Sequence, residues 1–372
     1  MSDPSQDRVH MAHALRLAAR GLGNVWPNPA VGCVVVRDGL VLGRGWTQPG
    51  GRPHAEVRAL DQAGPQAKGA TAHVTLEPCA HHGKTPPCAE ALIAAGVTRV
   101  VTALTDPDPR VSGRGHAMLR AAGIAVTEGV LSDRAARLNA GFLKRVMQGL
   151  PFVTLKLAAT LDGRTATASG ESRWITGPAA RRKVHALRLC HDAVMVGSGT
   201  AIADDPDLTV RDMGAPHQPV RVVLDRRLRH RPDSRLGRNA RTHPLWLLHG
   251  PSAPEAARQA WLATGAELIE VAETDGGLDL PAALGALAAR GLTRVLSEGG
   301  STLAAALIGA GLVDELALFS GAALIGGDGH PALASLGLGK LAEAPRPSLV
   351  ETERLGEDLF ALWRMPGRGS RP

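Results

Sequence analysis

Tyrosine is absent from this chain of 372 residues, and aromatic residues make up only 3% of it. Proteins that bind single-stranded nucleic acid stack the unpaired bases on aromatic side chains. The scarcity of such side chains therefore argues against nucleic acid as a partner. No uncharged apolar run approaches the roughly 18 residues of a membrane-spanning helix, so we expect no membrane partner either.

Cysteine is also scarce, with four in the chain, and the first ten residues, MSDPSQDRVH, contain no apolar core of a secretion signal. Both features are typical of a reducing compartment, and we expect a cytoplasmic protein. The formal net charge is +7, and the basic residues are spread along the chain. Such a charge suits phosphorylated small molecules as well as nucleic acid.

The length of the chain predicts two domains. A Gly-Leu-Pro break at 149–151 separates a helical run from a new strand-like run, so we expect domains over residues 1–147 and 151–366. Alternating helical and strand patterns in the first domain predict a three-layer α/β fold. Its expected strands are 31–36, 40–46, 72–76, 99–104 and 124–129, and its expected helices are 9–20, 55–63, 88–95 and 133–147.

The second domain also alternates between strands and helices, which predicts another α/β fold. Expected strands cover 152–157, 193–196, 220–224, 245–248, 267–271, 294–297 and 315–319. In the first domain, the helical connections of about a dozen residues or more are long enough for crossovers between parallel strands.

A zinc site is the strongest functional signal in the chain. His54 and Glu56 are followed by Cys79 and, after eight intervening residues, by Cys88. One imidazole and two thiolates suit zinc, and three protein ligands leave the fourth tetrahedral position open for water, as in catalytic sites. Glu56 then has the position of a general acid and base that moves protons during hydrolysis. The alternative is two ordinary buried cysteines beside a helix-capping histidine.

Proline residues place these ligands at helix starts. Pro53 precedes the expected helix 55–63, and Pro86 and Pro87 precede the helix that begins at Cys88. We expect the helix dipole to lower the pKa of the Cys88 thiol. Cys33 and Cys190 lie in apolar runs without partners at ligand spacing, which favours core packing for both.

Two glycine-rich turns follow apolar strands in the second domain, at 197–200 and 297–302. Each offers backbone N–H groups to a phosphate, although a simple strand-to-helix turn is the alternative for either one. Neither matches G-x-G-x-x-G, so a nucleotide fold other than the Rossmann type is indicated. Arg226 and Arg227 follow the strand 220–224, where a cation can meet the 2′-phosphate of NADPH; a solvated basic turn is an equal alternative.

Several motifs resemble the bifunctional deaminase and reductase family of riboflavin biosynthesis. In the first half they are PNPAVG at 27–32, HAE at 54–56, TLEPC at 75–79 and GKTPPC at 83–88. In the second half they are LDGR at 161–164, SGES at 169–172, WIT at 174–176, ADDP at 203–206 and EGG at 298–300. The resemblance extends from residue 8 to about residue 363.

The resemblance implies a cytidine-deaminase-like first domain and a dihydrofolate-reductase-like second domain. The first would deaminate 2,5-diamino-6-(ribosylamino)pyrimidin-4-one 5′-phosphate with one zinc ion. The second would use NADPH to reduce the ribosyl chain, giving 5-amino-6-(ribitylamino)uracil 5′-phosphate. The expected partners are these phosphorylated pyrimidines, and we expect a homo-oligomer.

The resemblance also implies binding residues. His54, Cys79 and Cys88 would hold zinc, and Asn28, His81 and Lys84 would contact the deaminase substrate. In the second domain the substrate contacts would be Lys156, Ser172, Arg188, Leu208, Arg211 and Glu298. The cofactor contacts would be Ala158, Trp174, Thr200, Asp204, Arg226, Gly300, Ser301, Thr302, Leu303, Ala304, Ala305 and Ala306. Arg188 and Arg211 suit the 5′-phosphate because guanidinium binds phosphate bidentately.

Two residues depart from the family pattern. Thr47 stands where many members carry a histidine, and Arg226 stands where a small hydroxyl residue is common. Two other functions fit parts of the sequence: a nucleic-acid deaminase that acts on a flipped base, and a zinc-stabilised interaction module fused to a nucleotide sensor. The wide cysteine spacing and the large second domain argue against the former, and Glu56 with an open coordination position argues against the latter.

Overall fold

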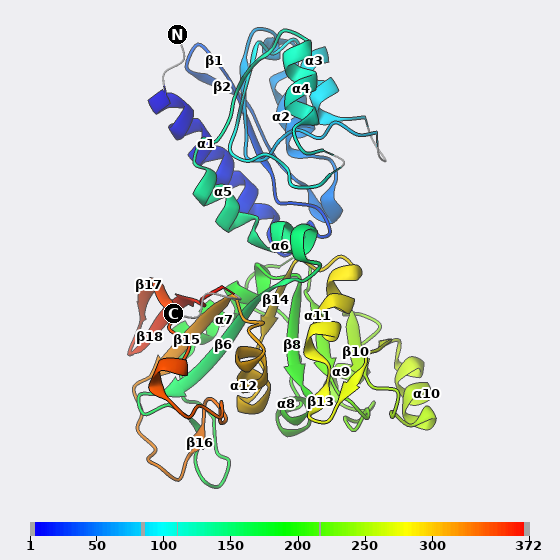
Figure 1. Ribbon diagram of the computed structural model, residues 1–372, viewed down its shortest axis with the longest axis vertical. Helices are drawn as coiled ribbons and strands as arrows, with labels where there is room; N and C mark the ends of the chain where they lie inside the picture. The colour runs from blue at the N-terminus through cyan, green and yellow to red at the C-terminus, as the bar shows by residue number, and fades with distance from the viewer. Residues whose placement is uncertain (1–3, 83–85, 110, 216, 368–372) are drawn as a thin grey trace. The chain divides into compact units, whose positions relative to one another are not determined.

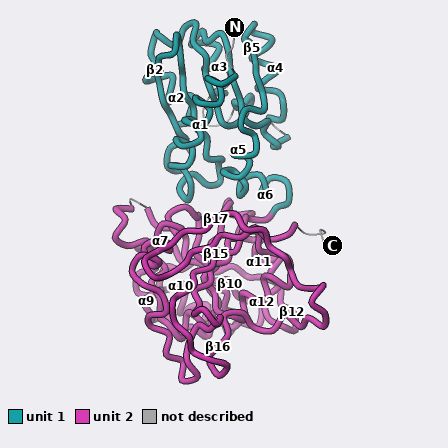
Figure 2. The backbone as a smooth tube through the Cα atoms, turned by 90° about the vertical axis from the view of Figure 1, so that its left-hand side faces the viewer, with its two compact units in different colours: residues 1–149 teal, residues 150–372 magenta. Residues whose placement is uncertain are grey.

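The computed structural model describes residues 4–82, 86–109, 111–215 and 217–367. The chain divides into two compact units, residues 1–149 and 150–372 (Figure 2). Within the described ranges, no helix is both long enough and apolar enough to cross a membrane.

The first unit is built on a five-stranded sheet with the order β2-β1-β3-β4-β5. β1 is antiparallel to both of its neighbours, whereas β3, β4 and β5 are parallel, as their helical crossovers require. The strands are β1 (Gly32–Arg37), β2 (Leu40–Trp46), β3 (Thr71–Val74), β4 (Arg99–Thr102) and β5 (Ala125–Thr127).

Helices cover both faces of this sheet, which confirms the expected three layers (Figure 1). Alternate residues of β1 separate two apolar cores. Cys33 and Val35 join the core beneath α2, α3 and α4, whereas Val34 and Val36 join the core beneath α1 and α5. The helices are α1 (Pro4–Ala18), α2 (Ala55–Ala63), α3 (Cys88–Ala94), α4 (Arg114–Ala121), α5 (Ser132–Leu138) and α6 (Ala140–Gln148), with 3₁₀ turns at Ala19–Gly21, Pro49–Gly51 and Gly64–Ala67.

The helix expected over residues 133–147 is divided at Asn139 into α5 and α6. The buried Asn139 side chain accepts a hydrogen bond from the backbone N–H of Ala30 at 3.0 Å and donates one to the Ala30 carbonyl at 3.0 Å. The break thus places an amide against a loop 109 residues earlier in the chain.

Glycine residues allow α2 to pack closely on β2. A Cβ atom on Gly43 would lie 1.9 Å from the Ala59 carbonyl oxygen, and one on Gly45 would lie 2.0 Å from the Ala55 carbonyl oxygen. Only glycine permits this backbone-to-backbone approach. The contact at Ala55 fixes the first turn of α2 against the sheet.

The second unit contains a nine-stranded sheet with the order β11-β10-β9-β8-β14-β6-β15-β18-β17. The strands from β11 to β15 are parallel, and β18 and β17 add antiparallel neighbours at one edge. The strands are β6 (Phe152–Thr160), β8 (Ala193–Gly197), β9 (Val220–Leu224), β10 (Leu245–His249), β11 (Glu267–Glu270), β14 (Arg294–Ser297), β15 (Glu315–Gly321), β17 (Ser348–Leu355) and β18 (Asp358–Arg364).

Two small ribbons and a set of helices complete this unit (Figure 1). The ribbons pair β7 (Arg164–Ala166) with β16 (His330–Pro331) and β12 (Glu273–Thr274) with β13 (Gly277–Leu278). The helices are α7 (Pro178–Leu189), α8 (Ser198–Asp204), α9 (Arg235–Arg238), α10 (Glu255–Thr264), α11 (Leu280–Ala289) and α12 (Ser301–Gly309), with a 3₁₀ turn at Leu341–Glu343. Both glycine-rich turns lie at carboxyl ends of parallel strands, after β8 and β14.

Candidate active sites

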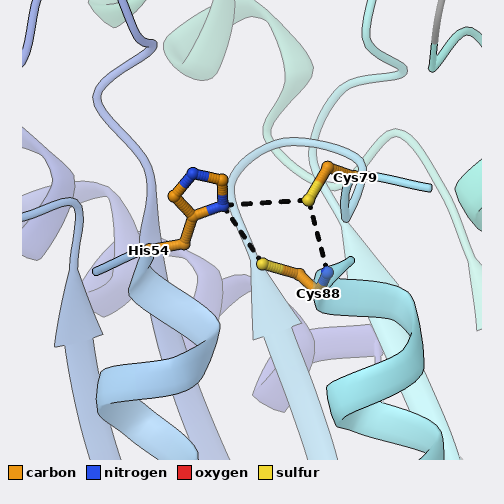
Figure 3. A group of neighbouring side chains, drawn as sticks. All are labelled: His54, Cys79 and Cys88. Atoms are coloured by element: carbon orange, nitrogen blue, oxygen red, sulfur yellow. Dashed lines mark hydrogen bonds between the residues drawn. The ribbon is translucent and has the colours of Figure 1, made fainter. Parts of the chain in front are cut away.

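His54, Cys79 and Cys88 come together in the first unit (Figure 3). His54 is the N-cap residue of α2, Cys79 lies in the loop after β3, and Cys88 is the first residue of α3. Their ligand atoms all lie within 4.8 Å of one another. His54 Nδ1 is 3.2 Å from Cys88 Sγ and 3.8 Å from Cys79 Sγ.

These separations fit a tetrahedral zinc ion. Zinc bonds of about 2.0 Å to nitrogen and about 2.3 Å to sulfur place the donor atoms about 3.5 to 3.8 Å apart. The backbone N–H of Cys88 also donates to Cys79 Sγ at 3.3 Å, an outer hydrogen bond that orients a thiolate ligand. The donor set and its spacing therefore suit zinc, with a fourth coordination position open.

Glu56 follows His54 by two residues and is only 3% exposed. Burial raises the pKa of its carboxyl group, although attraction to His54 opposes the shift. Glu56 interacts electrostatically with His54, Cys79 and Cys88, so its carboxylate lies beside the ligand cluster. A carboxylate within reach of a metal-held water is the arrangement that general acid and base catalysis needs.

The two thiols differ in acidity. Hydrogen bonding from the Cys88 thiol, with further help from His54 and the Cys88 backbone N–H, lowers the pKa of Cys79 to about 4. Cys88 donates to the Cys79 thiolate and is buried, and both effects raise its pKa. The lowered pKa expected for Cys88 concerns the thiolate that binds zinc, so it stays a prediction.

The loop that carries Asn28 is held at several points. The half-buried Asn28 side chain lies against Gly51, where a Cβ atom would approach Asn28 Nδ2 to 1.8 Å. Thr47 is 3% exposed, and its hydroxyl donates to the Pro29 carbonyl at 3.1 Å and accepts from the Val31 N–H at 3.0 Å. Thr47 thus fixes the backbone on the carboxyl side of Asn28.

Glu77 is a functional candidate that the sequence interpretation missed. Its buried carboxylate accepts hydrogen bonds from four backbone N–H groups of the segment after β4: Asp106 at 3.1 Å, Gly113 at 2.9 Å, Gly115 at 2.8 Å and His116 at 3.3 Å. This segment follows a parallel strand next to β3, so it lies beside the loop of Cys79. The sequence signal that could have indicated this role is the acidic residue of the TLEPC motif at 75–79.

His81 and Lys84 are the other residues expected to contact the substrate of the first domain. His81 is half-buried, and its Nδ1 atom has no hydrogen-bond partner among the residues that the structure describes. Lys84 lies outside the described residues.

Two cavities of about 1110 Å³ and 680 Å³ occupy the second unit. Both lie at carboxyl ends of parallel strands, and Thr200, Asp204, Gly300 and Ser301 line both of them. The Thr200 hydroxyl accepts a hydrogen bond from the Gly300 N–H at 3.0 Å, which joins the two glycine-rich turns. After the ligands that the sequence resemblance implies, the larger cavity is called the dinucleotide cavity below, and the smaller is called the sugar cavity.

The sequence-based cofactor residues divide between these cavities. Arg226, Thr302, Leu303 and Ala306 line the dinucleotide cavity, and Ala158 and Trp174 line the sugar cavity. Ala304 and Ala305 line neither, because both are buried on the core side of α12.

All six sequence-based substrate residues line the sugar cavity: Lys156, Ser172, Arg188, Leu208, Arg211 and Glu298. Arg188 forms a bidentate ion pair with Glu298 and also donates to the Thr209 carbonyl at 2.8 Å. Arg211 is more available, since its side chain is 53% exposed and its one described ion pair, with Asp207, is 3.7 Å long.

Arg181 and His185 also line the sugar cavity, and the sequence interpretation missed both. Trp174 is 70% exposed, and the Arg181 guanidinium lies 4.5 Å from its ring centroid, a cation–π contact. His185 accepts a hydrogen bond from the Arg211 N–H at 3.3 Å. Arg181, His185 and Arg188 are spaced by four and three residues on α7, so helical periodicity was the available signal.

Comparison with known proteins decides between the possible families. Residues 4–104 match the cytidine and deoxycytidylate deaminase zinc-binding region, and residues 151–361 match the RibD C-terminal domain. The riboflavin biosynthesis protein RibD of Escherichia coli K12 is 46% identical over 366 residues, which cover 95% of this chain and 98% of that protein. RibD of Aquifex aeolicus is 39% identical over 96% of this chain and 98% of that protein.

The chain belongs to the RibD family.

Solved RibD structures share the fold of this chain. Form 1 of Acinetobacter baumannii RibD has a TM-score of 0.89 at 42% identity, covering 98% of this chain and all of that one. A Thermotoga maritima deaminase and reductase has a TM-score of 0.85 at 34% identity, covering 98% and 99%. The expected fold class and the expected bifunctional riboflavin biosynthesis enzyme are therefore confirmed.

Proposed function

We propose that this RibD chain deaminates 2,5-diamino-6-(ribosylamino)pyrimidin-4-one 5′-phosphate in its first unit and reduces the ribosyl chain of the product in its second. The observation that carries the proposal is full-length similarity to RibD proteins together with a complete His54, Cys79 and Cys88 ligand set. The Thermotoga maritima relative carries both activities in its name, as a diaminohydroxyphosphoribosylaminopyrimidine deaminase and 5-amino-6-(5-phosphoribosylamino)uracil reductase.

Deamination exchanges the amino group for oxygen, with water consumed and ammonia released. Zinc held by the three ligands would supply a water whose pKa is lowered to about 7. Glu56 would take a proton from the nucleophile and return it to the leaving amine, since its buried carboxylate lies beside the ligand cluster. Asn28, His81 and Lys84 are the proposed contacts to the pyrimidine, and Glu77 would hold the neighbouring segment in place.

Reduction adds one hydride and one proton to the open-chain imine of the ribosyl group. NADPH would supply the hydride. The dinucleotide cavity would hold the cofactor, and the shared wall at Thr200, Asp204, Gly300 and Ser301 would bring its reactive end to the sugar cavity. The start of the nine-residue helix α12 offers backbone N–H groups to the pyrophosphate.

Lys156 and Asp204 are the proposed polar groups near the reacting carbon. Burial lowers the pKa of Lys156, although Glu298 opposes this shift. Asp204 lines both cavities and is the proposed proton partner. If it has this role, Asp204→Asn reduces the rate of reduction and leaves NADPH affinity unchanged; an unchanged rate would exclude it.

An ultraviolet assay of the zinc-loaded protein tests both activities. The diaminopyrimidine ribosyl phosphate is added first without NADPH and then with it. We expect deamination alone in the first step and NADPH oxidation only after it. No spectral change in either step, with zinc bound, would overturn the proposal and favour a nucleic-acid deaminase. The predicted homo-oligomer is checked by light scattering of the same sample.

A further inference from the structure

A basic turn follows β9 and forms part of the dinucleotide cavity. Arg226, Arg227 and Arg229 all line this cavity. Leu228 lies between them with its side chain 5% exposed and a positive φ of 52°, and its N–H donates to the Asp225 carbonyl at 3.0 Å. The buried Leu228 anchors the turn, so the flanking arginines extend from a fixed backbone.

Hydrogen bonds on both sides of Leu228 hold this turn. The Asp225 carboxylate accepts from the His230 N–H at 2.7 Å, and the Arg226 carbonyl accepts from the Gly250 N–H at 2.9 Å. The arginine side chains therefore start from positions that need little reordering when an anion binds.

Arg226 is not available as a free cation. Its Nε and Nη2 atoms both lie 2.7 Å from Glu273 Oε2. The other oxygen of Glu273 accepts from the Ser252 N–H at 3.1 Å and from its hydroxyl at 2.5 Å. Arg226 thus joins the turn to the start of β12, and the carboxylate compensates its charge.

Arg227 and Arg229 have no carboxylate partner among the residues that the structure describes. The Nη2 atom of Arg229 lies 3.5 Å from the hydroxyl oxygen of Ser198. Ser198 follows β8, and β8 is the parallel neighbour of β9, so the two carboxyl ends meet at one edge of the sheet. Of the two carboxylates that line this cavity, Asp279 accepts from the Ala282 N–H, and Asp204 lies at the boundary with the sugar cavity.

We infer that Arg229, with Arg227 and the Ser198 hydroxyl, binds the 2′-phosphate of NADPH, and that Arg226, whose charge Glu273 compensates, does not. The inference rests on the proposed reductase function. The cavity extends from the start of α12, where the pyrophosphate is proposed to bind, to these uncompensated guanidinium groups. A phosphate dianion matches guanidinium in charge and geometry, and a ribose without it gains no such contact. Arg229 therefore gives the preference for NADPH over NADH.

Calorimetric titration of the intact protein with adenosine 2′,5′-bisphosphate and with 5′-AMP tests this, because the two ligands differ only in the 2′-phosphate. We expect the unaltered protein to bind the bisphosphate at least about tenfold more tightly. Arg229→Ala should weaken bisphosphate binding about tenfold, as for one lost charged hydrogen bond, and leave 5′-AMP binding unchanged. Arg229→Lys should retain part of the preference.

Two controls separate this role from a general effect of charge. Arg231→Ala removes a cation that pairs with Asp233 and lines neither cavity, and it should leave both affinities unchanged. The double variant Arg226→Ala/Glu273→Ala removes a compensated pair, and it should retain the preference. Loss of the preference in this double variant, with Arg229→Ala unaffected, would overturn the inference.

The outcomes also distinguish this inference from the proposed function. A protein that oxidises NADPH during reduction but binds the two adenosine ligands equally overturns the inference alone. A protein that binds neither ligand and oxidises no NADPH overturns the reductase proposal and the inference together.

Discussion

Arg188 and Glu298 form a bidentate ion pair in the sugar cavity, with Nε 2.6 Å from Oε1 and Nη2 3.0 Å from Oε2. Their side chains are 11% and 9% exposed. Burial alone would raise the pKa of Glu298, but attraction and hydrogen bonding from Arg188 outweigh burial and lower it to about 2. The positive charge of Arg188 is therefore compensated by Glu298, so Arg188 is not a free cation for a phosphate group.

Arg188→Met should destabilise the second unit, because it leaves a buried carboxylate without its cation. Losing one member of such a pair costs about 3 to 5 kcal/mol. The exposed Arg211 provides the matched control, and Arg211→Ala should change stability by less than about 0.5 kcal/mol while raising the substrate KM. Urea unfolding and steady-state kinetics measure the two effects. Equal stability of Arg188→Met and Arg211→Ala would contradict the role of Arg188 as the cation that stabilises the buried Glu298 carboxylate.

Glu56→Gln should keep zinc and lose deamination, because glutamine is nearly the same size but cannot exchange a proton. Loss of this proton transfer typically lowers the rate about 10²-fold to 10⁴-fold. Cys79→Ser provides the comparison and should lose zinc as well as activity. Metal analysis beside the ultraviolet assay measures both quantities. Normal deamination by Glu56→Gln would remove Glu56 from the mechanism.

Glu77→Gln should loosen the segment from Asp106 to His116. The amide nitrogen would face backbone N–H groups that now donate to an oxygen, so at least one pair of hydrogen bonds is lost. Hydrogen exchange at Gly113 and Gly115 should accelerate at least about tenfold, with zinc retained and the deaminase KM raised. Glu90→Gln, on the partly exposed side of α3, should leave that exchange unchanged.

His191 should make the second unit less stable below pH 6.5. Its Nδ1–H donates to the Leu187 carbonyl at 2.7 Å, so the neutral Nε2 accepts from the Thr154 hydroxyl at 2.9 Å. Burial, followed by repulsion from Arg294, lowers the folded-state pKa to about 4. The unfolded chain, with a histidine pKa of about 6.5, therefore binds the proton first as the pH falls, and folding stability decreases from pH 6.5 to pH 4.

The expected loss across this window is roughly 3 kcal/mol. Tryptophan fluorescence during urea unfolding at pH 7.5 and pH 4.5 measures it, since four of the six tryptophans, at positions 174, 246, 261 and 363, lie in the second unit. His191→Gln should reduce the difference between the two pH values by about that amount. The same pH dependence in the variant would assign the effect to other groups.

The features predictable from sequence are those with short-range causes. Apolar runs at 31–36 and 220–224 became β1 and β9, because buried strands need little beyond their own side chains. His54 and Cys88 were predictable because Pro53, Pro86 and Pro87 place helix starts beside them. Here, one local pattern specified both the ligand and the element that carries it.

The features that escaped prediction depend on distant partners. Arg226 pairs with Glu273, 47 residues later, and Glu77 binds backbone groups up to 39 residues later. β17 was missed because its residues are nearly all exposed and polar residues interrupt its short apolar run, so only pairing with β18 reveals it. Patterns within one segment contain no information on such long-range contacts.

The amide of Asn139 determines where the first unit can be separated from the second. The match to the deaminase zinc-binding region ends at residue 104, and a polypeptide ended there would lose β5 and both hydrogen bonds to Ala30. The backbone N–H and carbonyl of Ala30, next to the loop that carries Asn28, would then lose their hydrogen-bond partner. A free-standing first unit of this chain therefore has to include Asn139, well beyond the region that matches the family model, and the compact unit itself ends at Gly149.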